Sequence, residues 1–155
     1  MDTISKIVSA MLDYQKEHSI TSRCMTNTQY LIDQIRHNCP DIPVKVAPVI
    51  VAGGMGDTLQ CVVHLVVLIN DTDILDPSYE TYSLNNKEYY GSYKVFYETL
   101  KHLELEKGKE FSKYILNSYL RLSKVADRIN KKEFCICNKE YYTSQADYVQ
   151  SVYKN

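Results

Sequence analysis

Residues 59–70 constrain the fold most strongly, because Val, Leu and Ile follow one another there almost without a break. A run of this length and β-branched content predicts a strand buried in the centre of a sheet. Turn-forming residues bound the run on both sides, at 53–57 and at 71–73. Shorter apolar runs at 44–51 and 74–76 predict two neighbouring strands, so that the three strands form an antiparallel meander.

Much of the remaining chain carries apolar residues at three- and four-residue spacing, which predicts amphipathic helices. Thr21 and Ser22 are good N-cap residues for the second helix, and Pro48 predicts a sheet edge or a bulge in the first strand. Residues 134–137 suggest one more short strand. The predicted helices cover residues 3–17, about 23–38, 93–103, 111–129 and 144–153.

These elements predict a single α+β domain over residues 1–155. Its N-terminal helices lead into a small antiparallel sheet, and the second helix packs on that sheet. We expect the core of the domain in residues 20–80 and a helical C-terminal part in residues 84–155. A chain of 155 residues is long enough for one compact core of this kind.

Composition excludes several classes of function. The 18 basic and 19 acidic residues give a net charge of −1, which offers no electrostatic basis for binding nucleic acid or an anionic membrane surface. No stretch approaches the roughly 20 apolar residues of a membrane span. The first residues lack the pattern of a secretory signal, and the five cysteines are odd in number and irregularly spaced. We therefore expect reduced thiols and a cytoplasmic protein.

Three residues in this frame are candidates for chemistry: Cys24, His64 and Asp76. Cys24 opens the second predicted helix, where unpaired backbone N–H groups favour the thiolate form of a cysteine. His64 interrupts the central strand, and its imidazole needs specific partners because both faces of that strand are apolar. Antiparallel pairing brings Asp76 within one to three residues of His64. A thiol, an imidazole and a carboxylate are the parts of a thiol-nucleophile triad.

Each of the three residues also has a purely structural interpretation. A cysteine is most often a small buried apolar residue, and a histidine in a strand is often a hydrogen-bonded core residue. An aspartate before proline commonly ends a strand in a turn. The combination of a cysteine at a helix start, a histidine in an apolar strand and an aspartate on the next strand favours the triad.

This arrangement resembles the transglutaminase-like superfamily, which belongs to the broader papain-like fold. That group includes transglutaminases, peptide N-glycanases, microbial peptidases and the related arylamine N-acetyltransferases. The resemblance covers residues 20–80, and its most specific part is His-Leu-Val-Val-Leu-Ile at 64–69 followed by Leu-Asp-Pro-Ser at 75–78. It implies Cys24 as the nucleophile, His64 as general base and acid, and Asp76 as the residue that orients His64.

The resemblance implies a metal-independent thiol enzyme without a cofactor. Its thiolate would attack a peptide or isopeptide-like amide of a peptide or protein substrate, and the resulting thioester would pass its acyl group to water or an amine. We favour hydrolysis, because nothing in the sequence marks a site for a second substrate.

The chain departs from the family at three points. Many members carry Gly, Trp or Tyr before the cysteine, where this chain has residues 21–23, Thr-Ser-Arg. Many carry an aromatic after the histidine, where this chain has Leu65, and the chain contains no tryptophan for an oxyanion site. Tyr14 and Gln15 are candidates for a substitute donor. These departures define the alternative, a catalytically inactive binding or scaffold protein with the same fold.

Two further patterns carry less weight. Residues 53–57, Gly-Gly-Met-Gly-Asp, lack the Lys-Ser/Thr of a phosphate-binding loop and favour a hairpin turn. Cys135 and Cys137 have a single residue between them and no nearby histidine, so we expect no metal site there.

Overall fold

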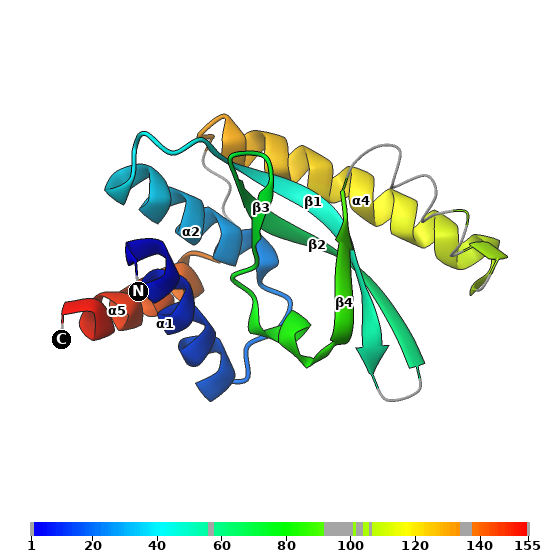
Figure 1. Cartoon of the computed structure of the whole chain (residues 1–155), viewed down its shortest axis with the longest axis horizontal. Coiled ribbons are helices and arrows are strands. Elements are labelled where there is room, and N and C mark those ends of the chain that lie inside the picture. Colours follow the sequence, from blue (N-terminus) through cyan, green and yellow to red (C-terminus); the bar gives the residue numbers. More distant parts are fainter. Residues whose placement is uncertain are drawn as a thin grey trace.

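Figure 1 shows the computed structural model of the chain, which describes residues 2–55, 58–91, 101, 104–105, 107–133 and 138–154. Within these residues the architecture is α+β, with two N-terminal helices, a curled four-stranded antiparallel sheet and two C-terminal helices. The predicted fold class is confirmed at this level. In Figure 1, α1, α2 and α5 gather at one end of the molecule together with both termini, and α4 lies along the sheet.

The two N-terminal helices are α1 (Thr3–Glu17) and α2 (Cys24–Asn38), both at their predicted positions. α1 begins after Asp2, whose carboxylate accepts a hydrogen bond from the Ser5 N–H at 2.8 Å. Both helices contribute their apolar faces to the main core, which also takes residues from the sheet, α4 and α5. Its buried members are Ile7, Ala10, Met11, Tyr30, Leu31, Ile32, Ile35, Val46, Leu65, Val67, Leu122, Ala126, Ile129 and Val149.

The predicted meander is confirmed, and its middle strand is interior to the sheet. In spatial order the strands are β3 (Asp73–Leu75), β2 (Thr58–Ile69), β1 (Val44–Met55) and β4 (Asn85–Tyr90). β1 runs farther than predicted, because Gly53 and Gly54 stay paired with β2. β4 pairs with residues 50–54 of β1. Among the described strands Pro48 therefore borders β2 alone, an edge position that tolerates its missing N–H.

The predicted helical part, 84–155, is wrong at its start. A 3-10 helix, η1 (Tyr79–Ser83), leads into β4 rather than into a helix. Asn, Lys and Glu are poor strand formers, so the local sequence of β4 gives little sign of a strand. Pairing with the edge of β1 determines the conformation instead. The predicted strand at 134–137 lies outside the described residues. The predicted helix at 93–103 also lies outside them, apart from residue 101.

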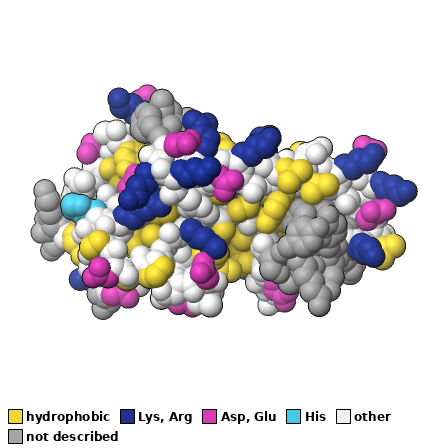
Figure 2. Space-filling view, turned by 90° about the horizontal axis from the view of Figure 1, so that it is seen from above, with side chains coloured by type: hydrophobic (Ala, Val, Ile, Leu, Met, Phe, Trp, Pro, Cys, Tyr) yellow, Lys and Arg dark blue, Asp and Glu magenta, His cyan; other side chains and the backbone are white. Residues whose placement is uncertain are grey.

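The C-terminal helices are α4 (Lys109–Asn130) and α5 (Lys139–Lys154), of which α5 begins five residues before its predicted start. Asn130 anchors the end of α4 to β1, since its side chain accepts from the Val46 N–H at 2.7 Å and donates to the Val46 carbonyl at 2.9 Å. Seen from the side of α4, Figure 2 shows basic and acidic side chains interspersed over the surface. None of the described helices is long and apolar enough to span a membrane.

Candidate active site

Cys24 is the first residue of α2, as predicted, but the helix is capped differently. The N-cap position belongs to Arg23, which makes no capping bond with its side chain, so the predicted caps Thr21 and Ser22 are wrong. Ser22 takes a left-handed conformation, with φ 59°, and donates its backbone N–H to the Glu80 carboxylate at 3.0 Å. This bond ties the turn before α2 to η1. It also leaves the N–H groups of the first turn without a side-chain cap beside the half-buried thiol.

His64 lies in the middle of β2 and is only 3% exposed. The register pairs it with Val49 of β1, and alternation places it on the same face as Val66, as predicted. Its Nε2 lies 2.8 Å from Oδ1 of Asp76, and the residue lines the same cleft as Cys24. Because Nε2 is engaged by the carboxylate, Nδ1 is the nitrogen available to the thiol. The structure therefore brings the three predicted residues together.

Asp76 directly follows β3 and is 6% exposed. β2 and β3 pair Val67 with Leu75, so Asp76 lies one step beyond the last pair and within the predicted offset from His64. Its carboxylate accepts four hydrogen bonds, which satisfy a buried charge and fix its orientation. The donors are His64 Nε2 (2.8 Å) and the Ser78 N–H (3.1 Å) to Oδ1, and the hydroxyls of Thr81 (2.6 Å) and Tyr89 (2.9 Å) to Oδ2.

The electrostatics of the site favour an ion pair between His64 and Asp76. Burial acts to lower the pKa of His64, but the hydrogen bond and charge attraction of Asp76, with a further contribution from the neighbouring Cys24, outweigh it and raise the pKa to about 10. Burial acts to raise the pKa of Asp76, but the bonds and charge of His64 outweigh this effect, and the pKa lies below its ordinary value. At neutral pH the imidazole is therefore protonated.

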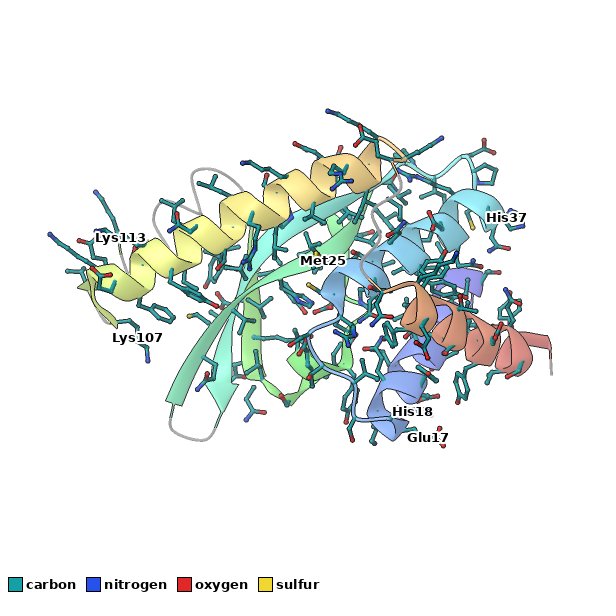
Figure 3. The ribbon with its side chains drawn as sticks, turned by 180° about the vertical axis from the view of Figure 1, so that it is seen from behind. Glu17, His18, Met25, His37, Lys107 and Lys113 are labelled. Carbon is teal, nitrogen blue, oxygen red and sulfur yellow. The ribbon has the colours of Figure 1, made fainter. Side chains whose placement is uncertain are left out.

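A cleft of about 390 Å³ opens beside Cys24 and His64. Its walls are the start of α2, residues 61–64 of β2, η1 and α4. This part of β2 lies beyond the end of its pairing with β3. Figure 3 labels Met25 at the point where the N-terminal end of α2 meets the sheet. The half-buried thiol thus faces a cleft, while the imidazole and carboxylate that support it are buried. Besides Cys24 and His64, the walls include Ser22, Met25, Cys61, Val62, Val63, Glu80, Thr81, Leu84, Tyr114, Ser118, Arg121 and Leu122.

A buried polar network lies behind the triad and was not predicted. It joins Gln15 of α1, Asn27 of α2, and Tyr141 and Gln145 of α5, all 7% exposed or less. Tyr141 donates its hydroxyl to Oδ1 of Asn27 at 2.7 Å, and Gln15 donates to Oε1 of Gln145 at 2.9 Å. A sequence signal existed for one member, because Gln15 follows the buried Met11 by four residues on the apolar face of α1.

The two candidates for an oxyanion donor are placed elsewhere. The Gln15 amide donates to the Pro77 carbonyl at 2.7 Å and to Gln145, and its oxygen accepts from the Tyr79 N–H at 2.8 Å. Its donors are therefore already occupied. Tyr14 packs against other rings, with its centroid 4.3 Å from that of His18, and is not among the residues that line the cleft.

Comparisons of this chain with protein-family models, with curated proteins and with solved structures find no match. Among the described residues, no group of three or more His, Cys, Asp or Glu side chains is placed to hold a metal ion. Cys135 and Cys137 lie outside the described residues.

Proposed function

We propose that this protein is a metal-independent thiol hydrolase of the transglutaminase-like, papain-like type that cleaves an amide bond in a peptide or protein. One observation carries the proposal: the buried Asp76 carboxylate hydrogen-bonds to His64, and His64 lines one cleft with the Cys24 thiol. A nucleophile, its base and an orienting carboxylate need this order and these contacts. The sequence resemblance of residues 20–80 supports the same assignment.

The chemistry follows from the protonation states. The Cys24 thiolate attacks the amide carbonyl carbon, a C–S bond forms, and the carbonyl electron pair moves to oxygen. As the pair returns, the C–N bond breaks and His64 gives its proton to the departing amine. Water then attacks the thioester while His64 takes one of its protons. The C–S bond then breaks with the thiolate as leaving group, the acid departs, and Cys24 and His64 return to their starting states. Asp76 keeps the imidazole oriented in every step.

The first turn of α2 would supply the oxyanion site. The backbone N–H groups at the start of a helix have no intrahelical partner, and here Arg23 provides no side-chain cap. These donors lie beside the Cys24 thiol, where negative charge develops on the substrate oxygen. The missing tryptophan therefore does not deprive this site of hydrogen-bond donors.

The side of β2 that faces away from β1, at residues 61–64 beyond its pairing with β3, would hold an extended substrate backbone. The Asn70 N–H donates to the Pro43 carbonyl at 3.0 Å, and continuing the β1–β2 register from this bond shows that even-numbered residues of β2 bond to β1. The main-chain groups of Val63 therefore point toward the opposite edge, and Val63 also lines the cleft. An extended peptide paired there would bring its amide carbonyl close to Cys24.

Covalent capture of the acyl group tests the proposal. We would incubate the protein with peptides bearing main-chain, glutamine and lysine-isopeptide amides, and follow the mass of the Cys24 peptide. The expected result is a transient acyl adduct on Cys24 with release of the acid. Cys24→Ala should lose both the adduct and the product while unfolding at an unchanged denaturant concentration.

Cys39 provides a matched control, because it is another half-buried thiol at the opposite end of the same helix. Cys39→Ala should keep the adduct and the turnover. If the native protein forms no adduct, and iodoacetamide at pH 6 alkylates Cys24 no faster than Cys39, the hydrolase assignment is refuted and the inactive scaffold takes its place.

A further inference from the structure

We propose that Asn27 and Ser78 are positioning residues of this site, and that α5 orients Asn27. Together they hold the turn that carries Asp76 in register with the helix that carries Cys24. The inference rests on the proposed function, since positioning has meaning only if the thiol acts as a nucleophile.

Asn27 and Ser78 connect the two ends of the triad. Asn27 lies three residues after Cys24, about one helical turn away, and is 1% exposed. Its Nδ2 donates to the Ser78 hydroxyl at 3.0 Å. The Ser78 N–H in turn donates to Oδ1 of Asp76 at 3.1 Å, the same oxygen that accepts from His64. The hydrogen bonds therefore form a chain that leads from the imidazole through carboxylate, serine and asparagine to α2, the helix that begins with Cys24.

Two residues of α5 fix the orientation of the Asn27 amide. Its Oδ1 accepts from the Tyr141 hydroxyl at 2.7 Å and from Nε2 of Gln145 at 3.3 Å. With two donors aimed at the oxygen, the amide nitrogen is directed toward Ser78. Neither α5 residue is among those that line the cleft. The C-terminal helix therefore reaches the site through Asn27 and, from Gln145, through Gln15 of α1.

The turn after Asp76 is also held from the side of α1. Gln15 donates to the Pro77 carbonyl at 2.7 Å and accepts from the Tyr79 N–H at 2.8 Å. Ser78, which lies between these two residues, is 1% exposed. The turn is therefore gripped by α1 on one side and by α2 on the other.

A network of this kind is poorly explained by stability alone. Burying amides and hydroxyls sacrifices their hydration, and the protein bonds that replace it return little net free energy. The main core beside the network is already built from apolar side chains. Catalytic proton transfer, by contrast, requires heavy atoms within about 2.6–3.2 Å. A small shift of the Asp76 turn against α2 would move His64 relative to the thiol.

Ser78→Ala tests the inference, and Ser83→Ala is its matched control. Ser83 lies five residues later, and its exposed hydroxyl bonds only locally, to the Glu80 carbonyl at 3.0 Å. We would measure the rate of Cys24 alkylation by iodoacetamide at pH 6 and at pH 9. Under the proposed function, alkylation at pH 6 depends on His64, whereas at pH 9 an ordinary thiol ionises without help.

We expect Ser78→Ala to lower the alkylation rate at pH 6 by about fivefold, the effect of one lost hydrogen bond, with little change at pH 9. Ser83→Ala should match the native protein at both values. Tyr141→Phe, which keeps the ring and removes the hydroxyl that orients Asn27, should change the ratio of the two rates in the same direction. It provides a readout even if Ser78→Ala folds poorly.

The outcomes separate the two proposals. If Ser78→Ala and Tyr141→Phe lower the unfolding midpoint but leave the ratio of rates at its native value, the residues are merely structural and the positioning role is overturned. If Cys24 of the native protein is itself no faster at pH 6 than Cys39, the proposed function fails first. A lowered ratio in both variants, with a rapid native thiol, supports the inference.

Discussion

Asp76→Asn is the most informative substitution, because it removes one charge while preserving shape. The carboxamide oxygen can still accept from His64 and from the Ser78 N–H, as Oδ1 does in the native protein. The new NH2 group faces the hydroxyls of Thr81 and Tyr89, which can rotate to accept. All four contacts can therefore survive as neutral hydrogen bonds. The variant isolates the effect of the buried charge.

The magnitude follows from those four contacts. A hydrogen bond to a charged group contributes about 1.5–3 kcal/mol and a neutral one about 0.5–1.5 kcal/mol, so the four conversions together lose roughly 4 kcal/mol. The weaker desolvation of an amide offsets part of this loss, and we expect the free energy of unfolding to fall by about 2 kcal/mol. For a chain of 155 residues this corresponds to a decrease in Tm of about 4–8 °C.

The same substitution should change the reactivity of the thiol. Burial lowers the pKa of His64, and in the native protein the carboxylate opposes this effect. Without the carboxylate the pKa falls, and we expect the imidazole to be neutral at pH 7. We expect iodoacetamide to alkylate Cys24 at pH 6 at least about tenfold more slowly than in the native protein. Urea titration gives the stability, and mass spectrometry of the Cys24 peptide gives the rate.

Asp73→Asn is the control for Asp76→Asn, because it makes the same chemical change at an exposed position three residues earlier on β3. It should alter neither stability nor alkylation measurably. The reasoning is refuted if Asp76→Asn retains both the native unfolding midpoint and the native rate at pH 6. In that case the buried carboxylate does not act on the thiol.

Two further predictions concern the ion pair and the sheet. The pKa of His64 is raised to about 10, so its contribution to stability is fully present below pH 6.5 and is lost as the pH rises through 10. The native protein should therefore lose its advantage over His64→Gln between pH 6 and 10, by on the order of 4 kcal/mol in urea titrations, and a constant difference would argue against the pair. A Cβ on Gly53 would lie 2.9 Å from Cβ of Leu84, so Gly53→Ala should displace β4 and lower the free energy of unfolding by about 1–3 kcal/mol, whereas an unchanged urea midpoint would contradict this contact.

Local periodicity was sufficient for the elements that form the core. The spacing of apolar residues predicted α1, α2 and α4, and the apolar run at 59–70 predicted β2, because these elements bury one continuous face or strand. Burial selects the same residues that the pattern reveals. The beginning of α5 was placed too late because its first turn carries few apolar residues.

β4 and the start of α2 could not be predicted in the same way. β4 is a half-exposed edge strand, and its pairing partner lies more than thirty residues earlier in the chain. Ser22 was a plausible cap by residue type, but its backbone is turned toward Glu80 of η1. In both cases a contact with a distant residue decided the conformation. For β4 the local sequence had no clear preference, and for Ser22 the contact overrode the local preference for a cap.

The site shows the same division between local and distant information. Cys24, His64 and Asp76 each occupied a recognisable local position, and the antiparallel register limited the offset between the last two. The placing of the thiol and the imidazole on one cleft required the packing of α2 against the sheet. The amides behind the triad were harder to find, because a polar residue in a helix gives no sign of whether it faces solvent or a partner 130 residues away, as Gln15 and Gln145 show.

The buried pair of His64 and Asp76 points to a function, because the stability of the fold gains little from it. Buried ion pairs stabilise a protein weakly, since removing two charges from water offsets most of their attraction. In this sheet the neighbouring positions are filled by Val49 and Val66, and a well-packed apolar pair would serve the core at least as well. Five further polar contacts around Asp76 and its turn, from α1, α2, η1 and β4, would be unnecessary to such a core. They become intelligible if the carboxylate must hold an imidazole at a fixed distance from a thiol that opens on a cleft.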